Sequence, residues 1–208
     1  MIFSESNVSP VFSPRGVGRS ARALALSLVL ALGVAVALGA CATPSSTPSE
    51  VSQAGDIPDD QVFVPVNGES GAFTVTVPEG WSSATVGGVT TYTDKLNSIS
   101  IEQTAVSAAP TVDSVTADVV PGLLAARANS AGGEVTAFTA KGGDGIHVAF
   151  TADSAADPVT GKSRPDAVEV YLFWRAGQQV ALTLEGPTTA DNVDPWRIVS
   201  DSFTWTNQ

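Results

Sequence analysis

The sequence is poor in the residues that build most catalytic and metal sites. Its 208 residues include one cysteine, Cys41, and one histidine, His147. A disulfide within the chain needs two cysteines, so the chain has none to stabilise it. The common zinc sites take several cysteine and histidine ligands, so they are excluded as well.

Patterns for nucleophilic catalysis are also missing. A serine hydrolase needs a histidine beside its nucleophile, and many show a Gly-x-Ser-x-Gly turn. The nearest match, Gly68-Glu69-Ser70-Gly71, lacks that spacing. His147 alternates with the apolar residues Ile146 and Val148, which predicts a histidine on the surface of a sheet rather than a catalytic base. No glycine-rich loop opens a helix, which disfavours nucleotide binding. We therefore expect a non-enzymatic protein without a cofactor.

Positive charge is scarce, with 10 lysines and arginines against 21 aspartates and glutamates. This excess of negative charge repels phosphate backbones and disfavours nucleic acid as a partner. The pattern of carboxylates singles out no glycosidase pair. Asp56, Asp59 and Asp60, and the stretch Asp153–Asp157, are candidates for calcium, but neither has the spacing of a known calcium loop. We predict no metal site.

The N-terminal region has the layout of a bacterial export signal. Arginines lead into an uncharged run, Ala23–Ala40, that ends in small residues just before Cys41. The sequence Leu38-Gly39-Ala40-Cys41 resembles the lipobox of bacterial lipoproteins, which implies acylation of the cysteine thiol and cleavage before it. The alternative is an uncleaved membrane helix, since the run has about the minimum length to span a bilayer. We predict a signal peptide over 1–40 and a lipid anchor, with fatty acids such as palmitate, on Cys41.

This anchor predicts a protein held on the outer face of the cell membrane. Loss of residues 1–40 leaves 7 basic and 20 acidic residues, a formal net charge of −13. Residues 42–60 are rich in serine, threonine, proline and acid and have almost no large apolar side chains, so they cannot offset the entropy cost of folding. We predict a flexible tether over 41–60, with its glycosylation left open, and one globular domain over 61–208.

Alternating apolar residues predict strands in the first half of this domain. Phe73, Val75 and Val77 share one face before a turn at Pro78-Glu79-Gly80. Two further runs, Val89–Thr93 and Ile99–Glu102, each have one polar face, which favours an antiparallel sheet.

A helical stripe follows. It consists of apolar residues three and four positions apart: Val112, Val115, Val119, Leu123 and Ala126. Thr111 or Asp113 is positioned to cap its start, and Gly132-Gly133 ends it. Pro121 is expected to kink this helix or split it in two.

The second half of the domain returns to strands and closes with a short helix. Strands are predicted at Glu134–Ala140, at Gly145–Ala152 and on both sides of a hairpin turn at Ala176-Gly177. Asp194-Pro195 predicts the N-cap and first residue of a helix, with a last strand at Phe203–Trp205. The tryptophans are candidates for a ligand platform, although core packing is the favoured interpretation for each. They are Trp81, Trp174, Trp196 and Trp205.

Two passages, Phe73–Trp81 and Leu184–Phe203 with its Gly-Pro and Asp-Pro-Trp steps, resemble the LpqN-type lipoproteins of mycolic-acid-producing actinobacteria. The resemblance implies a PsbP-like α+β fold, a cell-envelope location, and function through binding rather than catalysis. We expect a single antiparallel sheet of six or seven strands with two or three helices packed on it.

The favoured hypothesis is a monomeric, lipid-anchored envelope protein that binds a protein partner or an envelope lipid. The alternatives are an envelope hydrolase that acts on carbohydrate or ester through carboxylates, and an extracytoplasmic solute-binding module. A cleft with two carboxyl groups, one of raised pKa, favours the hydrolase. A deep apolar pocket favours lipid carriage, and a small polar pocket favours solute binding.

Overall fold

The computed structural model describes residues 53–68 and 71–206. The predicted signal peptide, Cys41 and most of the predicted tether lie outside the described residues and stay predictions. Within residues 53–68 and 71–206, no helix is long and apolar enough to cross a membrane.

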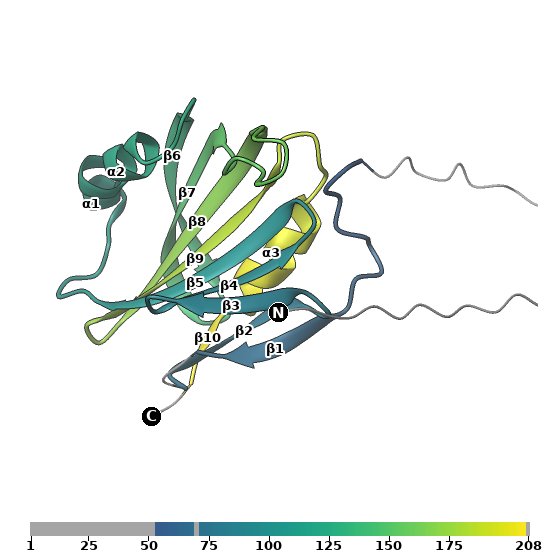
Figure 1. The fold of residues 1–208 in the computed structure, drawn as a ribbon. Helices are drawn as coiled ribbons and strands as arrows, with labels where there is room; N and C mark the ends of the chain where they lie inside the picture. The colour runs from purple at the N-terminus through teal and green to yellow at the C-terminus, as the bar shows by residue number, and fades with distance from the viewer. Residues whose placement is uncertain (1–52, 69–70, 207–208) are drawn as a thin grey trace, which may run out of the picture. The chain divides into compact units, whose positions relative to one another are not determined.

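Seven antiparallel strands form the main sheet, in the order β3-β4-β5-β9-β8-β7-β6 (Figure 1). The strands are β3 (Ser82–Val86), β4 (Val89–Asp94), β5 (Asn97–Ala105), β6 (Ala131–Ala140), β7 (Gly143–Asp153), β8 (Pro165–Arg175) and β9 (Gln178–Pro187). The predicted hairpin turn at Ala176-Gly177 joins β8 to β9, and both residues have the positive φ that such tight turns require.

A second, three-stranded sheet corrects the prediction of a single sheet. Its strands are β1 (Phe63–Asn67), β2 (Phe73–Pro78) and β10 (Thr204–Trp205), in the order β1-β2-β10. The alternation of Phe73, Val75 and Val77 correctly predicted a strand with one buried face. Alternation identifies faces but not pairing partners, so it did not reveal that β2 pairs outside the main sheet.

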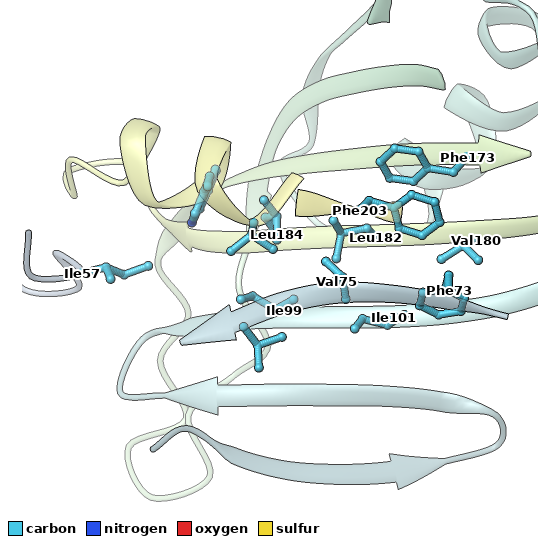
Figure 2. Packing of buried hydrophobic residues seen from close by; sticks show 13 residues of the cluster. Ile57, Phe73, Val75, Ile99, Ile101, Phe173, Val180, Leu182, Leu184 and Phe203 are labelled. Carbon is cyan, nitrogen blue, oxygen red and sulfur yellow. The ribbon is translucent and has the colours of Figure 1, made fainter. Parts of the chain in front are cut away.

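The small sheet and helix α3 (Val193–Ser202) cover one face of the main sheet. Figure 2 shows Phe73 and Val75 of β2 opposite Val180 and Leu182 of β9, with Phe203 between the layers. The ring of Phe203 stacks on that of Phe173, with centroids 3.8 Å apart. Buried aromatic and aliphatic area of this kind supplies most of the stabilisation of a domain.

The other face of β7 and β8 packs against one helical segment in three consecutive pieces, which lies beside β6 and β7 in Figure 1. These pieces are α1 (Val112–Ser114), the π-helical turn η1 (Val115–Val119) and α2 (Val120–Ala125). Pro121 lies in the first turn of α2 and has no N–H for an α-helical bond. The Val120 N–H instead donates to the Val115 carbonyl, five residues back. The proline thus splits the predicted helix through a π turn, with Thr111 as the N-cap.

The N-cap of α3 differs from the prediction. Asn192 holds that position, while Asp194 lies in the first turn of the helix and pairs with Arg197 on the surface. The Asn192 side chain makes no capping bond, because it is buried and bonded to the segment before β1. Asparagine is a common N-cap residue, but here the Asn192 side chain makes a tertiary contact instead of capping the helix. The local sequence does not reveal this contact.

Residues 55–57, which the sequence analysis assigned to the tether, pack on the domain. Ile57 is 5% exposed and belongs to the core cluster shown in Figure 2. Its N–H donates to Asn192 Oδ1 at 2.9 Å. The packed part of the chain therefore includes residues upstream of Gln61.

Candidate functional site

A cleft of about 610 Å³ lies between the β1–β2 hairpin and the β3–β4–β5 end of the main sheet. It is larger than a second cavity, of about 460 Å³, on the opposite face of the main sheet. Its lining residues come from both sheets and are Asn67, Gly68, Phe73, Thr85, Gly88, Thr90, Tyr92, Ile101, Gln103 and Gln178. None of them carries a charged side chain, although the chain as a whole is strongly acidic.

The lining combines an apolar floor with polar groups. Phe73, Tyr92 and Ile101 supply the apolar and aromatic part. Hydroxyl and amide groups supply the rest, with the two threonine oxygens of Thr85 and Thr90 2.9 Å apart. Burial raises the pKa of Tyr92, so its phenol stays protonated at neutral pH and is available as a hydrogen-bond donor. The site therefore suits an uncharged ligand with both apolar and hydrogen-bonding groups.

Strand register explains how distant residues meet in this cleft. Thr85 pairs with Thr90 and Thr90 with Ile101, so all three side chains lie on one face of neighbouring strands. Gly68 follows the last residue of β1 and lines the cleft on the side of the β1–β2 hairpin. A Cβ atom at this position would lie 2.2 Å from the Phe73 ring. Glycine at this position therefore allows the chain to turn closely over the aromatic ring.

His147 lies where the sequence predicted, half-buried on the side of β7 opposite Ile146 and Val148. Its ring stacks on Tyr171 with centroids 4.5 Å apart, and its Nε2 lies 3.4 Å from Glu169 Oε2. The Tyr171 hydroxyl donates to the same carboxylate. Burial alone would raise the pKa of Glu169, but the hydrogen bonds from His147 and Tyr171 outweigh it and lower the pKa.

This His147 cluster does not form a hydrolase site. The hydroxyl next to the imidazole belongs to exposed Thr136, 3.5 Å from Nδ1, which is the outer limit for a hydrogen bond. His147 does not line the 610 Å³ cleft, nor the cavities of about 460, 240 and 190 Å³ in the described part of the chain. The arrangement lacks a place where a substrate carbonyl would meet a nucleophile and an oxyanion donor.

Two carboxylates, Asp166 and Glu185, meet at one end of β8 and β9 with two arginines. Arg127 binds Glu185 through both terminal nitrogens, and Arg164 Nε lies 3.0 Å from Asp166 Oδ1. Burial raises the pKa of Asp166 to about 7, and a hydrogen bond with Glu185 adds to this effect. The pair meets one condition set out for a hydrolase, a carboxyl group with a raised pKa.

Other features of the same pair contradict catalysis. Asp166 is fully buried and does not line the adjoining 190 Å³ cavity, which Glu185 and Arg164 reach. The two carboxyls bond to each other, which leaves no room between them for a glycosidic bond or a water. We interpret the group as a structural charge cluster.

The tryptophans serve mainly the core, as predicted. Trp196 is buried, and Trp81 and Trp205 pack against the same core cluster. Trp174 differs, because it lines a second cavity of about 460 Å³ on the opposite face of the main sheet. Its ring is held in place by a 2.8 Å hydrogen bond from Nε1 to the Val106 carbonyl.

The calcium candidates do not gather into a ligand set. In the described part of the chain, no three His, Cys, Asp or Glu side chains lie close enough together to hold a metal ion. Asp56 accepts a bond from the Asp191 N–H, and Asp157 caps its own turn through the N–H groups of Val159 and Thr160. Both side chains thus have local structural roles.

Comparisons with known proteins identify solved structures that resemble this chain. Neither the scan of protein-family models nor the search of curated proteins gives a match. The solution structure of cyanobacterial PsbP from Synechocystis sp. PCC 6803 has a TM-score of 0.52 and 14% identity, and covers 78% of this chain and 99% of its own. The crystal structure of LpqN, involved in cell envelope biogenesis of Mycobacterium tuberculosis, has a TM-score of 0.46 and 15% identity, and covers 72% of this chain and 93% of its own. The structure of the Saccharomyces cerevisiae Ran-binding protein Mog1p has a TM-score of 0.46 and 12% identity, and covers 70% of this chain and 96% of its own. The first of these likenesses confirms the predicted α+β, PsbP-like fold.

Proposed function

We propose that this protein is a lipid-anchored, non-catalytic lipoprotein of the cell envelope, and that its PsbP-like domain binds an uncharged segment of a partner protein. The observation that carries the proposal is the 610 Å³ cleft, which has no charged lining residue in a chain of formal net charge −11. A region without charge on such an acidic surface suits a partner that brings no charge of its own into the cleft.

The composition of the cleft favours a polypeptide over an acyl chain. Six of its ten lining residues offer amide or hydroxyl groups: Asn67, Thr85, Thr90, Tyr92, Gln103 and Gln178. An acyl chain offers no donor or acceptor to these groups beyond the bonds that Thr85 and Thr90, and Gln103 and Gln178, make with each other, at a cost of about 1–3 kcal/mol for each group that it leaves unsatisfied. The backbone N–H and C=O groups of a polypeptide would satisfy them, while its side chains would contact Phe73, Tyr92 and Ile101.

Binding is also favoured because none of the carboxylates with a shifted pKa in the described part of the chain lines the cleft. Glu169 is bonded to His147 and Tyr171, and Asp166 and Glu185 are held by arginines. Active sites, in contrast, present such groups to a bound substrate. The proposed anchor on Cys41 would hold this binding domain at the outer face of the cell membrane, within reach of other envelope proteins.

Site-specific photocrosslinking in cells tests the proposal. A benzophenone amino acid replaces Thr90 in the cleft in one variant and Thr91 in a matched control. Both side chains are half-buried on β4, but they point to opposite faces of the sheet. We expect adducts that contain a peptide from another protein at position 90 and not at position 91. Lipid adducts at position 90 alone, or the same adducts at both positions, would refute a protein-binding cleft.

A further inference from the structure

Strand β3 forms one edge of the main sheet, and no strand within residues 53–68 and 71–206 pairs with its outer side. All five residues of β3 are exposed, and Val86 is 78% exposed. The strand reads Ser82-Ser83-Ala84-Thr85-Val86 and contains no charge, no proline and no bulge. An uncharged, regular edge strand presents free backbone groups to which another strand can pair.

The turn to β4 indicates which backbone groups face outward. Val86 pairs with Val89 across the two-residue turn Gly87-Gly88, whose φ angles of 61° and 86° fit a type I′ turn. The residues next to such a turn form a hydrogen-bonded pair, and hydrogen-bonded and non-hydrogen-bonded pairs alternate along the ladder. Ser83 and Thr85 therefore direct their N–H and C=O groups away from the sheet.

The other edge strands in the described part of the chain carry protective features. Strand β6, at the far end of the main sheet in Figure 1, has a bulge between Gly132 and Glu134 and a charge at Glu134. In the small sheet, β1 contains Pro65, and β10 has two residues. Bulges, charges, prolines and short length all discourage strand addition, and β3 has none of them.

We propose that β3 is the docking edge for the partner, which adds an extended, uncharged segment to the main sheet as an additional strand. This inference rests on the proposed function and specifies how the partner is recognised. Main-chain bonds to Ser83 and Thr85 provide affinity, and the cleft provides selectivity for one side chain of the added strand.

The position of Thr85 connects the edge to the cleft. Thr85 lies on β3 and lines the cleft, and its hydroxyl contacts that of Thr90. In an added antiparallel strand, the side chain opposite Thr85 projects from the same face, with Cβ atoms about 4.5–5.5 Å apart. Alternate side chains of the added strand therefore point toward the cleft, where Tyr92 and Ile101 favour an apolar or aromatic group.

A partner segment fits this edge better than a second copy of the chain. A stable protein interface buries about 800 Å² on each partner, far more than a pair of five-residue strands provides. Two copies would also repel each other through their common negative charge. A peptide segment avoids this repulsion and gains additional contact in the cleft.

Peptide selection against the full-length lipoprotein in nanodiscs tests the mode of recognition. The probe is a phage-displayed library of random eight-residue peptides, followed by affinity measurements on synthetic copies of the enriched peptides. Ser83→Pro removes one outward N–H at an edge position that tolerates proline, and the control Ser83→Ala keeps that N–H. Thr85→Pro is the second variant if Ser83→Pro fails to fold, with folding checked by circular dichroism.

We expect enriched peptides with alternating apolar residues, at least tenfold weaker binding to the proline variant, and binding to Ser83→Ala within about twofold of wild type. Peptide binding is also expected to slow hydrogen exchange in β3. Equal binding to wild type and the proline variants would overturn strand addition, and Thr90→Trp would then show whether the cleft still binds. Peptides that bind all these variants as tightly as wild type, or a selection that enriches no peptide, would overturn the proposal. So would a dimer of the protein alone that Ser83→Pro dissociates, because a second copy would then occupy the edge.

Discussion

Asn97 and Asn192 share a buried hydrogen bond, 2.9 Å from Asn192 Nδ2 to Asn97 Oδ1, and both side chains also donate to the Gly55 carbonyl. The two asparagines are 4% exposed. This network connects the start of β5, the N-terminus of α3 and the segment before β1. It secures the point where the described chain enters the core, within residues 55–57 of the predicted tether.

Asn192→Ala is expected to destabilise the domain by about 2–3 kcal/mol, because it leaves the Ile57 N–H and Asn97 Oδ1 buried without partners. Urea unfolding at pH 7 measures the loss. The control Ser163→Ala removes an exposed hydroxyl and is expected to change stability by less than about 0.5 kcal/mol. Similar values for both variants would show that the network adds no stability.

The Asp166–Glu185 pair predicts a distinctive pH dependence of stability. The pKa of Asp166 rises from 3.8 to about 7 on folding, so the folded chain binds this proton more tightly than the unfolded chain. The resulting stabilisation is complete below about pH 4 and is lost as the pH rises through 7. Glu185 has the opposite sign, since its lowered pKa stabilises the fold above its ordinary pKa and loses that effect in acid.

Asp166→Asn keeps an amide donor for Glu185 and cannot titrate. We expect the free energy of unfolding of the variant, relative to that of wild type, to rise by on the order of 1–2 kcal/mol as the pH increases from 5 to 8. Urea midpoints for both proteins across this range measure the difference. Parallel curves for wild type and variant would show that Asp166 does not titrate in this range.

Two arginine pairs offer a comparison between buried and exposed charges. Arg127 and Glu185 side chains are 23% and 19% exposed, whereas Arg197 and Asp194 are 66% and 75% exposed. Arg127→Met leaves Glu185 beside Asp166 without its cation and is expected to cost about 2–4 kcal/mol. Arg197→Met is expected to cost less than about 0.5 kcal/mol. Equal costs in thermal unfolding would contradict the interpretation of a structural charge cluster.

Cys41→Ser tests the lipid anchor. The wild-type protein is expected to partition into the detergent phase of a Triton X-114 extract, with a mass that matches an acylated chain starting at Cys41. The variant lacks the thiol that accepts the lipid, so we expect the uncleaved chain of 21.2 kDa without an acyl group. Identical intact masses and identical partition would exclude a lipoprotein.

The strands with one apolar face were predictable from the sequence, because alternation records which side is buried. This holds for β2, β5, β7, β8 and β9. Strand β3 was missed because Ser82–Val86 is exposed on both faces and has no apolar alternation. Strand β1, which contains Pro65 and precedes Phe73, was also not predicted.

The cleft could not be predicted for a related reason. It forms where the β1–β2 hairpin lies over the main sheet, and it joins Gln103 and Gln178 from strands far apart in sequence. Local patterns determine strand faces and turns, whereas the pairing of β2 with β10 depends on packing across the whole domain.

Native mass spectrometry of the lipoprotein isolated from the envelope of an actinobacterial host, released in mild detergent, distinguishes protein binding in the cleft from lipid carriage. We expect a protein that carries its own acyl anchor and no further lipid, together with a co-isolated polypeptide. Thr90→Trp in the cleft is expected to remove that polypeptide, and Thr91→Trp on the opposite face is expected to retain it. A retained lipid mass that Thr90→Trp abolishes and Thr91→Trp preserves would rule out a protein-binding cleft and identify the cleft as a lipid-carrying site.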